Sequence, residues 1–136
     1  MEVIRWGILG LGNIAHKFAS DLSKVNGCKL YGVASYREHV AEKFAVKFNV
    51  KKFYNNYQKL ILDKEIDIIY IATLNQDHYK YSIEALSNKK AVLCEKPLAI
   101  NKSQVQNLIK CSKKNNSFLM EALWTRFNPS FKQLLS

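Results

Sequence analysis

The sequence predicts a doubly wound α/β fold, in which helices cover both faces of a mostly parallel sheet. Short apolar runs alternate with segments of helical spacing along all 136 residues. One run, IDIIYIAT at 66–73, is apolar almost throughout, which is typical of a strand buried on both faces. Strands that alternate with helices of this length pair in parallel, because each helix carries the chain back to the same end of the sheet.

The elements follow one another in a regular order. Apolar runs predict strands at 3–9, 28–35, 52–55, 66–73, 91–94 and 117–123. Helical spacing of apolar residues predicts helices at 14–22, 40–48, 57–63, 77–87 and 101–114. Asn49 is suited to end the second long helix, and Asn101 with Gln104 resembles a capping pair at the start of the last. Pro129 could open one more helix.

Charge and composition narrow the class of protein. The net charge of +10 suggests a nucleic-acid partner, but the lysines are spread over every segment and nowhere exceed two in a row. A solvated basic surface, which would also favour an anionic cofactor or substrate, is therefore the preferred interpretation. The three cysteines and three histidines are scattered and lack metal-ligand spacing, so we expect no metal site.

The chain shows no signal for a membrane or for secretion. No apolar run approaches the roughly 20 residues that cross a bilayer, and the opening MEVIRWGILG lacks the order of a signal peptide. We therefore expect a cytoplasmic protein with no membrane partner.

A glycine-rich turn lies between the first predicted strand and the first predicted helix. In GILGLGNIA, Gly10, Gly12 and Ala15 fit the pattern G-x-G-x-x-G/A. The first glycine permits a tight turn and the second lets the backbone approach a pyrophosphate, which would lie at the N-H groups near Asn13 and Ile14. A purely structural turn is the alternative, but the strand-turn-helix context favours a dinucleotide site.

The end of the second strand bears on which dinucleotide binds. An NAD site usually places an acid there to bind the adenosine ribose. Here the strand ends with Ser35, Tyr36 and Arg37, and no acid appears before Glu38. Hydroxyls and a guanidinium suit a 2'-phosphate, so we expect NADP in preference to NAD. Alternatively, Arg37 only begins a solvated helix.

Five segments together resemble a known family. They are GILGLGNIA (7–15), VASYRE (33–38), IDIIYIATLNQDH (66–78), AVLCEKPLAI (91–100) and LMEALWTRFNP (119–129). In this order and spacing they resemble the N-terminal half of the glucose-fructose oxidoreductase / inositol dehydrogenase (Gfo/Idh/MocA) family. The last segment is most similar to the branch that contains dimeric dihydrodiol dehydrogenase and NADP-dependent xylose dehydrogenase.

The resemblance implies a Rossmann domain, here 1–123, followed by a second domain of which 124–136 would be the truncated start. It implies an oxidoreductase that binds NADP or NAD, acts on a sugar, cyclic polyol or diol, and could form a homo-oligomer. The cofactor-binding residues carried over are Gly10, Leu11, Gly12, Asn13, Ile14, Ser35, Tyr36, Arg37, Thr73, Leu74, Asn75, His78, Glu95, Lys96, Trp124 and Arg126. A histidine at the start of a helix is as often a cap or packing residue, so His78 has both interpretations.

Departures from the family pattern limit what it implies. Leu74 replaces the usual proline of a T-P-N motif, and Tyr36 stands where an arginine is usual. A catalytic histidine found in many relatives would lie beyond the last residue. A non-catalytic dinucleotide sensor or regulatory module is therefore the alternative function for the chain by itself.

The motif Glu95-Lys96-Pro97 carries the predicted chemistry. Moving a hydride from a carbinol carbon to a nicotinamide also requires removal of the hydroxyl proton. Lys96 is the candidate catalytic residue: it could accept that proton or stabilise the alkoxide, if partial burial and the nicotinamide cation favoured its neutral form. Glu95 would orient the lysine or contact the cofactor.

Overall fold

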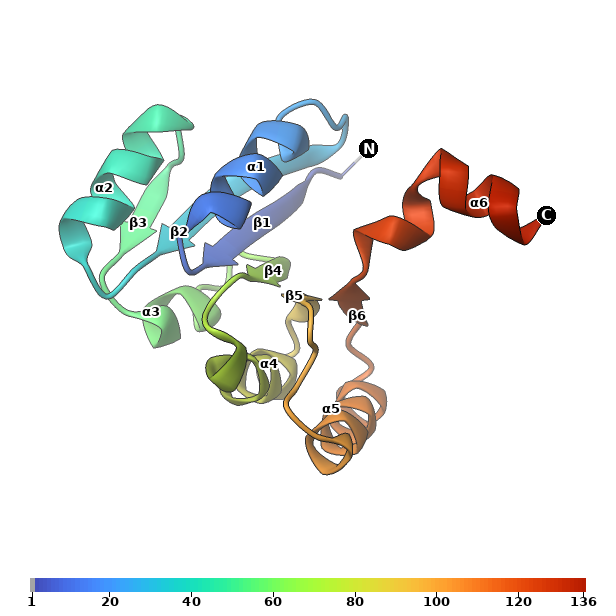
Figure 1. The fold of residues 1–136 in the computed structure, drawn as a ribbon. Coiled ribbons are helices and arrows are strands. Elements are labelled where there is room, and N and C mark those ends of the chain that lie inside the picture. The colour runs from blue at the N-terminus through green and yellow to red at the C-terminus, as the bar shows by residue number, and fades with distance from the viewer. Residues whose placement is uncertain (1) are drawn as a thin grey trace.

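The computed structural model describes residues 2–136 and contains one sheet of six parallel strands, in the order β3-β2-β1-β4-β5-β6 (Figure 1). The strands are β1 (Ile4–Leu9), β2 (Cys28–Ala34), β3 (Lys52–Tyr54), β4 (Ile68–Ile71), β5 (Ala91–Glu95) and β6 (Leu119–Ala122). All six predicted strands are confirmed, although β4 and β6 are shorter than their apolar runs. The strand order reverses between β1 and β4, so the crevice used by ligands in doubly wound folds lies at their carboxyl ends.

The helices lie on both faces of the sheet, as predicted. The buried residues form two clusters, one on each face of the sheet. One cluster includes residues of α1 (Asn13–Leu22) and α2 (Glu38–Lys47). The other includes residues of α3 (Tyr57–Ile61), α4 (His78–Ser87) and α5 (Lys102–Asn115). Strand β4 contributes side chains to both clusters, because successive side chains of a strand point to opposite faces of the sheet. Tyr70 belongs to the α1 side, whereas Ile69 and Ile71 belong to the α4 side.

The predicted helix ends have the expected local contacts. Asn49 adopts a left-handed φ of 52° just after α2. At the start of α5, the Asn101 side chain accepts the backbone N-H of Gln104 at 2.9 Å. The Gln104 side chain in turn accepts the backbone N-H of Ile100 at 3.3 Å, one residue before the expected position.

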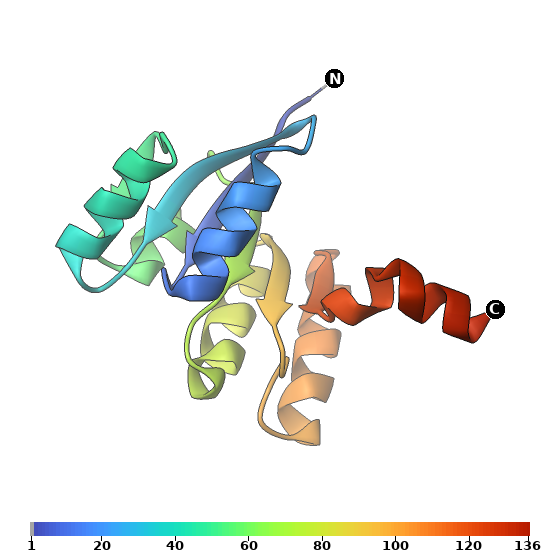
Figure 2. The ribbon, with the colours of Figure 1, turned by 45° about the horizontal axis from the view of Figure 1, so that its top comes forward.

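Among residues 2–136, no helix covers the face of β5 and β6 that lies opposite α4 and α5. Helices α4 and α5 pack beneath β4, β5 and β6, and α1 crosses the opposite face only as far as β4 (Figure 2). Beyond β6, a 3-10 turn η2 (Trp124–Phe127) and a helix α6 (Pro129–Leu135) extend away from the sheet. All residues of 124–136 are exposed. Among residues 2–136, none of the helices has the length and apolar character of a membrane span.

Candidate dinucleotide and catalytic site

The turn after β1 has the backbone geometry that the glycine motif predicts. Gly10 has a φ of +83°, and a Cβ placed on it would lie 2.6 Å from the carbonyl oxygen of Ala72. Gly12 differs, because a Cβ on it would meet no protein atom within 4 Å. Gly10 is therefore required by the protein backbone itself, whereas Gly12 borders open space of the kind that a pyrophosphate would fill.

The first turn of α1 offers free N-H groups to that space. Gly12 is the N-cap and provides no side chain, and the first turn contains no acidic residue. Asn13 and Ile14 are exposed, while Ala15 is fully buried against the sheet. The N-terminal end of this ten-residue helix therefore fits an anionic pyrophosphate, which its N-H groups and dipole would stabilise.

The residues after β2 are arranged by contacts among themselves. The Ser35 hydroxyl accepts the backbone N-H of Arg37 at 3.2 Å and is largely buried. The Tyr36 ring packs against Tyr57 at 4.4 Å, and its hydroxyl lies 2.9 Å from that of Tyr81. Arg37 is exposed, and its guanidinium has no ion-pair partner among residues 2–136, so it is free to bind an anion.

The loop between β4 and α4 contains Thr73, Leu74 and Asn75, of which Leu74 and Asn75 are exposed. His78 does not share that exposure. It is 1% exposed, with Nδ1 2.7 Å from the Pro97 carbonyl oxygen and Nε2 3.1 Å from the Thr73 carbonyl oxygen. Both ring nitrogens are thus engaged by the protein, which favours the packing interpretation over direct cofactor contact. His78 joins the loop after β4 to the loop after β5.

Glu95 is the last residue of β5, and each of its two carboxylate oxygens accepts a hydrogen bond. Its Oε1 accepts the hydroxyl of Tyr70 at 2.5 Å, and its Oε2 accepts the backbone N-H of Lys96 at 3.3 Å. The Tyr70 ring stacks on Phe18 at 3.9 Å, with 20° between the ring planes. Burial and the bond to Glu95 raise the pKa of Tyr70, so its hydroxyl stays a donor.

The surroundings of the Lys96 side chain differ in part from those that the sequence predicts. That side chain is exposed, so the partial burial expected to favour its neutral form is absent among residues 2–136. Glu95 does not orient the Lys96 ammonium either, because the carboxylate faces Tyr70 and the Lys96 backbone instead. The physical reason is strand order: β4 lies next to β5 and brings Tyr70 within hydrogen-bonding distance.

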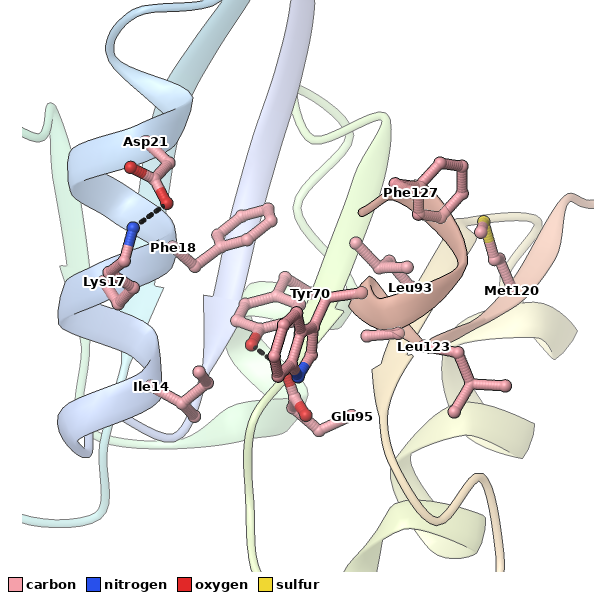
Figure 3. Close-up of a pocket in the computed structure, with 12 residues that line it drawn as sticks. Ile14, Lys17, Phe18, Asp21, Tyr70, Leu93, Glu95, Met120, Leu123 and Phe127 are labelled. Carbon is pink, nitrogen blue, oxygen red and sulfur yellow. Dashed lines mark hydrogen bonds and ion pairs between the residues drawn. The ribbon is translucent and has the colours of Figure 1, made fainter. Parts of the chain in front are cut away.

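A cavity of about 540 Å³ opens on the face of the sheet that carries no helix (Figure 3). It extends from Ile14 in the first turn of α1 to the η2 residues Trp124 and Phe127. Its lining is mainly apolar, and Glu95 projects into it (Figure 3). The complete lining is Ile14, Lys17, Phe18, Asp21, Tyr70, Leu93, Glu95, Met120, Ala122, Leu123, Trp124 and Phe127.

Several predicted groups converge on one edge of the sheet. Gly10, Ser35, Thr73, Glu95 and Trp124 each lie at or just after the carboxyl end of a strand. Ile14, Glu95 and Trp124 share the cavity, whereas Arg126 is exposed on η2 and does not line it. Within residues 2–136, no cluster of three or more metal-ligating side chains is present.

Tyr70 and Phe18 are not among the site residues that the sequence predicts. Tyr70 is the one hydroxyl in the apolar strand β4, and a buried tyrosine hydroxyl usually needs a partner. That signal could have marked it as a polar contact. Phe18 is partly buried and lines the cavity, because its outer edge faces the part of the sheet that no helix covers.

The comparisons with known proteins agree with this geometry. The model of the GFO_IDH_MocA family, described as "Oxidoreductase family, NAD-binding Rossmann fold", matches residues 4–123. The chain belongs to this family. The six-stranded parallel sheet described above is therefore the NAD-binding Rossmann fold of this family.

Two curated relatives of the same name are similar to this chain. Trans-1,2-dihydrobenzene-1,2-diol dehydrogenase of Danio rerio is 38% identical over 129 residues, which are 93% of this chain and 39% of the relative. The Mus musculus protein of the same name is 38% identical over 133 residues, 96% of this chain and 40% of the relative. The chain thus spans about 40% of the length of the curated relatives it matches.

Solved structures share the fold. A 3-ketoreductase from Actinomadura kijaniata in complex with NADP and TDP-benzene has a TM-score of 0.94 and 25% identity over 98% of this chain and 41% of its own. A probable dehydrogenase from Thermotoga maritima has a TM-score of 0.91 and 31% identity over 96% of this chain and 39% of its own.

Proposed function

We propose that this chain is the cofactor-binding part of an NADP-preferring oxidoreductase, which moves a hydride between the nicotinamide and a hydroxyl-bearing carbon of a diol, sugar or cyclic polyol. The observation that carries the proposal is the open space at Gly12, beside the free N-H groups of α1. The substrate class is supported by the curated relatives, which are named as diol dehydrogenases.

The bound dinucleotide would extend in two directions from the start of α1, with its adenosine half toward β2 and its nicotinamide half toward β4 and β5. Gly10, Leu11, Gly12, Asn13 and Ile14 would surround the pyrophosphate at the start of the helix. Toward β2, Ser35, Tyr36 and Arg37 would receive the adenosine ribose. Toward β4 and β5, Thr73, Leu74, Asn75 and Glu95 would line the nicotinamide half, with Trp124 across the cavity and Arg126 on the same turn.

Lys96 is the proposed catalytic residue. When bound, the dinucleotide supplies the hydride acceptor or donor. The exposed Lys96 follows Glu95 at the end of β5, next to the cavity, and its ammonium group has no ion-pair partner among residues 2–136. In its neutral amine form Lys96 would take the hydroxyl proton of a substrate, and as the ammonium it would return that proton in the reverse direction. His78 acts as a positioning residue, because it bonds the loop that follows Lys96.

We expect NADP to bind about tenfold more tightly than NAD, since one guanidinium-phosphate contact contributes about 1.4 kcal/mol or more. Calorimetric titration of the purified chain with both dinucleotides measures this. Arg37→Ala should remove most of the difference, while Lys43→Ala, at an exposed position of the helix α2 that follows Arg37, should leave it unchanged. Binding of neither dinucleotide would overturn the proposed function, and tighter binding of NAD would overturn the cofactor preference.

We also propose that residues 124–136 begin a second structural unit and that their exposed apolar side chains support a homo-oligomer. Phe131, Leu134 and Leu135 lie on one face of α6, at i, i+3 and i+4. Contiguous exposed apolar surface of this kind commonly marks an interface. Light scattering over a concentration series should show self-association, and Leu134→Asp should weaken it. A monomer at every concentration would contradict this.

A further inference from the structure

The cavity beside α1 contains one carboxylate that no cation neutralises. Three of its lining residues are charged, and two of them, Lys17 and Asp21, form an ion pair with 2.5 Å between Nζ and Oδ2. Among residues 2–136, Glu95 has no cationic side chain within ion-pair distance. The other side chains that share the cavity with it are mainly apolar, so they screen its charge less than water would.

Tyr70 fixes where this charge lies. Its hydroxyl is 2.5 Å from Oε1 of Glu95, the residue as a whole is 1% exposed, and its ring is stacked on Phe18. The backbone N-H of Lys96 holds Oε2 at 3.3 Å. With both oxygens engaged, the carboxylate cannot turn freely toward solvent. Tyr70 is a positioning residue, since it acts through Glu95 rather than on a ligand directly.

The nicotinamide half of a dinucleotide would extend toward this carboxylate, which makes the inference rest on the proposed function. A pyrophosphate at the start of α1 lies next to Ile14, and Ile14 and Glu95 project into the same cavity (Figure 3). The adenosine half would extend the other way, toward β2, so the nicotinamide half is left with the β4 and β5 strand ends.

The two redox forms of the dinucleotide differ in charge at that end. The oxidised nicotinamide ring is a cation, whereas the reduced ring is neutral. We propose that Glu95, held by Tyr70, makes this site prefer the oxidised dinucleotide over the reduced one. A fixed carboxylate in a mainly apolar cavity attracts the cationic ring and gains nothing comparable from the neutral ring.

The test compares the Kd values of NADP⁺ and NADPH for the purified chain, measured by calorimetry at pH 7.5. The quantity of interest is the ratio of the NADPH Kd to the NADP⁺ Kd. Glu95→Gln should lower that ratio about fivefold or more, because it removes the charge and keeps the shape. Tyr70→Phe should lower it about two- to threefold, because the carboxylate loses its donor while the ring stack remains.

Two variants serve as matched controls. Glu42→Gln makes the same charge change at an exposed carboxylate of α2, outside the cavity. Tyr31→Phe also removes a tyrosine hydroxyl that donates to a glutamate, at 3.3 Å from Glu65 and outside the cavity. Both should leave the ratio unchanged, since a purely structural effect alters the affinity for both redox forms equally.

The outcomes separate the inference from the proposed function. If the wild-type chain binds neither NADP⁺ nor NADPH, the proposed function fails. If it binds both and Glu95→Gln leaves the ratio unchanged, the preference attributed to Glu95 is wrong and the dinucleotide site stands. If only Tyr70→Phe leaves the ratio unchanged, the positioning role of Tyr70 is wrong. Should Tyr70→Phe fail to fold by circular dichroism, Glu95→Gln decides the proposal.

Discussion

Gly12→Val is expected to weaken dinucleotide binding about 100-fold, equivalent to about 2.7 kcal/mol, while leaving the unfolding temperature almost unchanged. A Cβ at this position meets no protein atom within 4 Å, and its φ of −81° is one that any residue adopts. The valine side chain would instead occupy the space at the start of α1 where we place the pyrophosphate. Calorimetry with NADP⁺ and thermal unfolding without ligand measure the two effects.

The neighbouring glycine provides the matched control, because its substitution should have the opposite profile. In Gly10→Ala, the new Cβ would lie 2.6 Å from the Ala72 carbonyl oxygen at a φ of +83°. The backbone can relieve neither this close contact nor the strain of the left-handed conformation without a large cost in free energy. We expect a loss of about 2–4 kcal/mol of folding free energy and a drop of roughly 10 °C in the midpoint. A Gly12→Val variant that binds NADP⁺ as tightly as the wild type would contradict the placement of the pyrophosphate.

Lys96→Met is expected to lower turnover by about 100-fold or more, the usual contribution of a positioned proton-transfer group. Because the chain spans 39% of the Danio rerio relative, it would be joined to the part of that relative which it does not match, and assayed with trans-1,2-dihydrobenzene-1,2-diol and NADP⁺. NADP⁺ affinity should stay within about threefold, because the exposed Lys96 does not support the fold.

An exposed lysine nearby makes the control. Lys102→Met alters the first residue of α5 and should leave turnover unchanged. Unchanged turnover in Lys96→Met would show that another group moves the proton. A fused wild-type protein that binds NADP⁺ without turnover would favour the non-catalytic binding module over the enzyme.

Much of the fold could be predicted from local pattern. The spacing of apolar residues located all six strands and the long helices, since periods of 2 and 3.6 are properties of single elements. The caps at Asn49 and Asn101 were likewise predictable, because each depends on a few neighbouring residues. Strand ends were less accurate: the apolar run 66–73 is longer than β4, because Ile66 is buried ahead of the strand and Ala72 and Thr73 follow it in the loop.

The sequence by itself determined the glycine turn, the order of motifs and their convergence at the carboxyl ends of parallel strands. Only the tertiary structure decided that Tyr70 holds Glu95, that His78 is enclosed by two carbonyl groups, and that Tyr36 meets Tyr81. The Tyr36–Tyr81, Tyr70–Glu95 and His78–Pro97 contacts join residues 19 to 45 positions apart in the sequence. The contact of His78 with Thr73 depends on how the imidazole ring is turned. The spacing of residues along one strand or helix does not specify them, because they arise when β4 packs beside β5 and α4 packs beneath both.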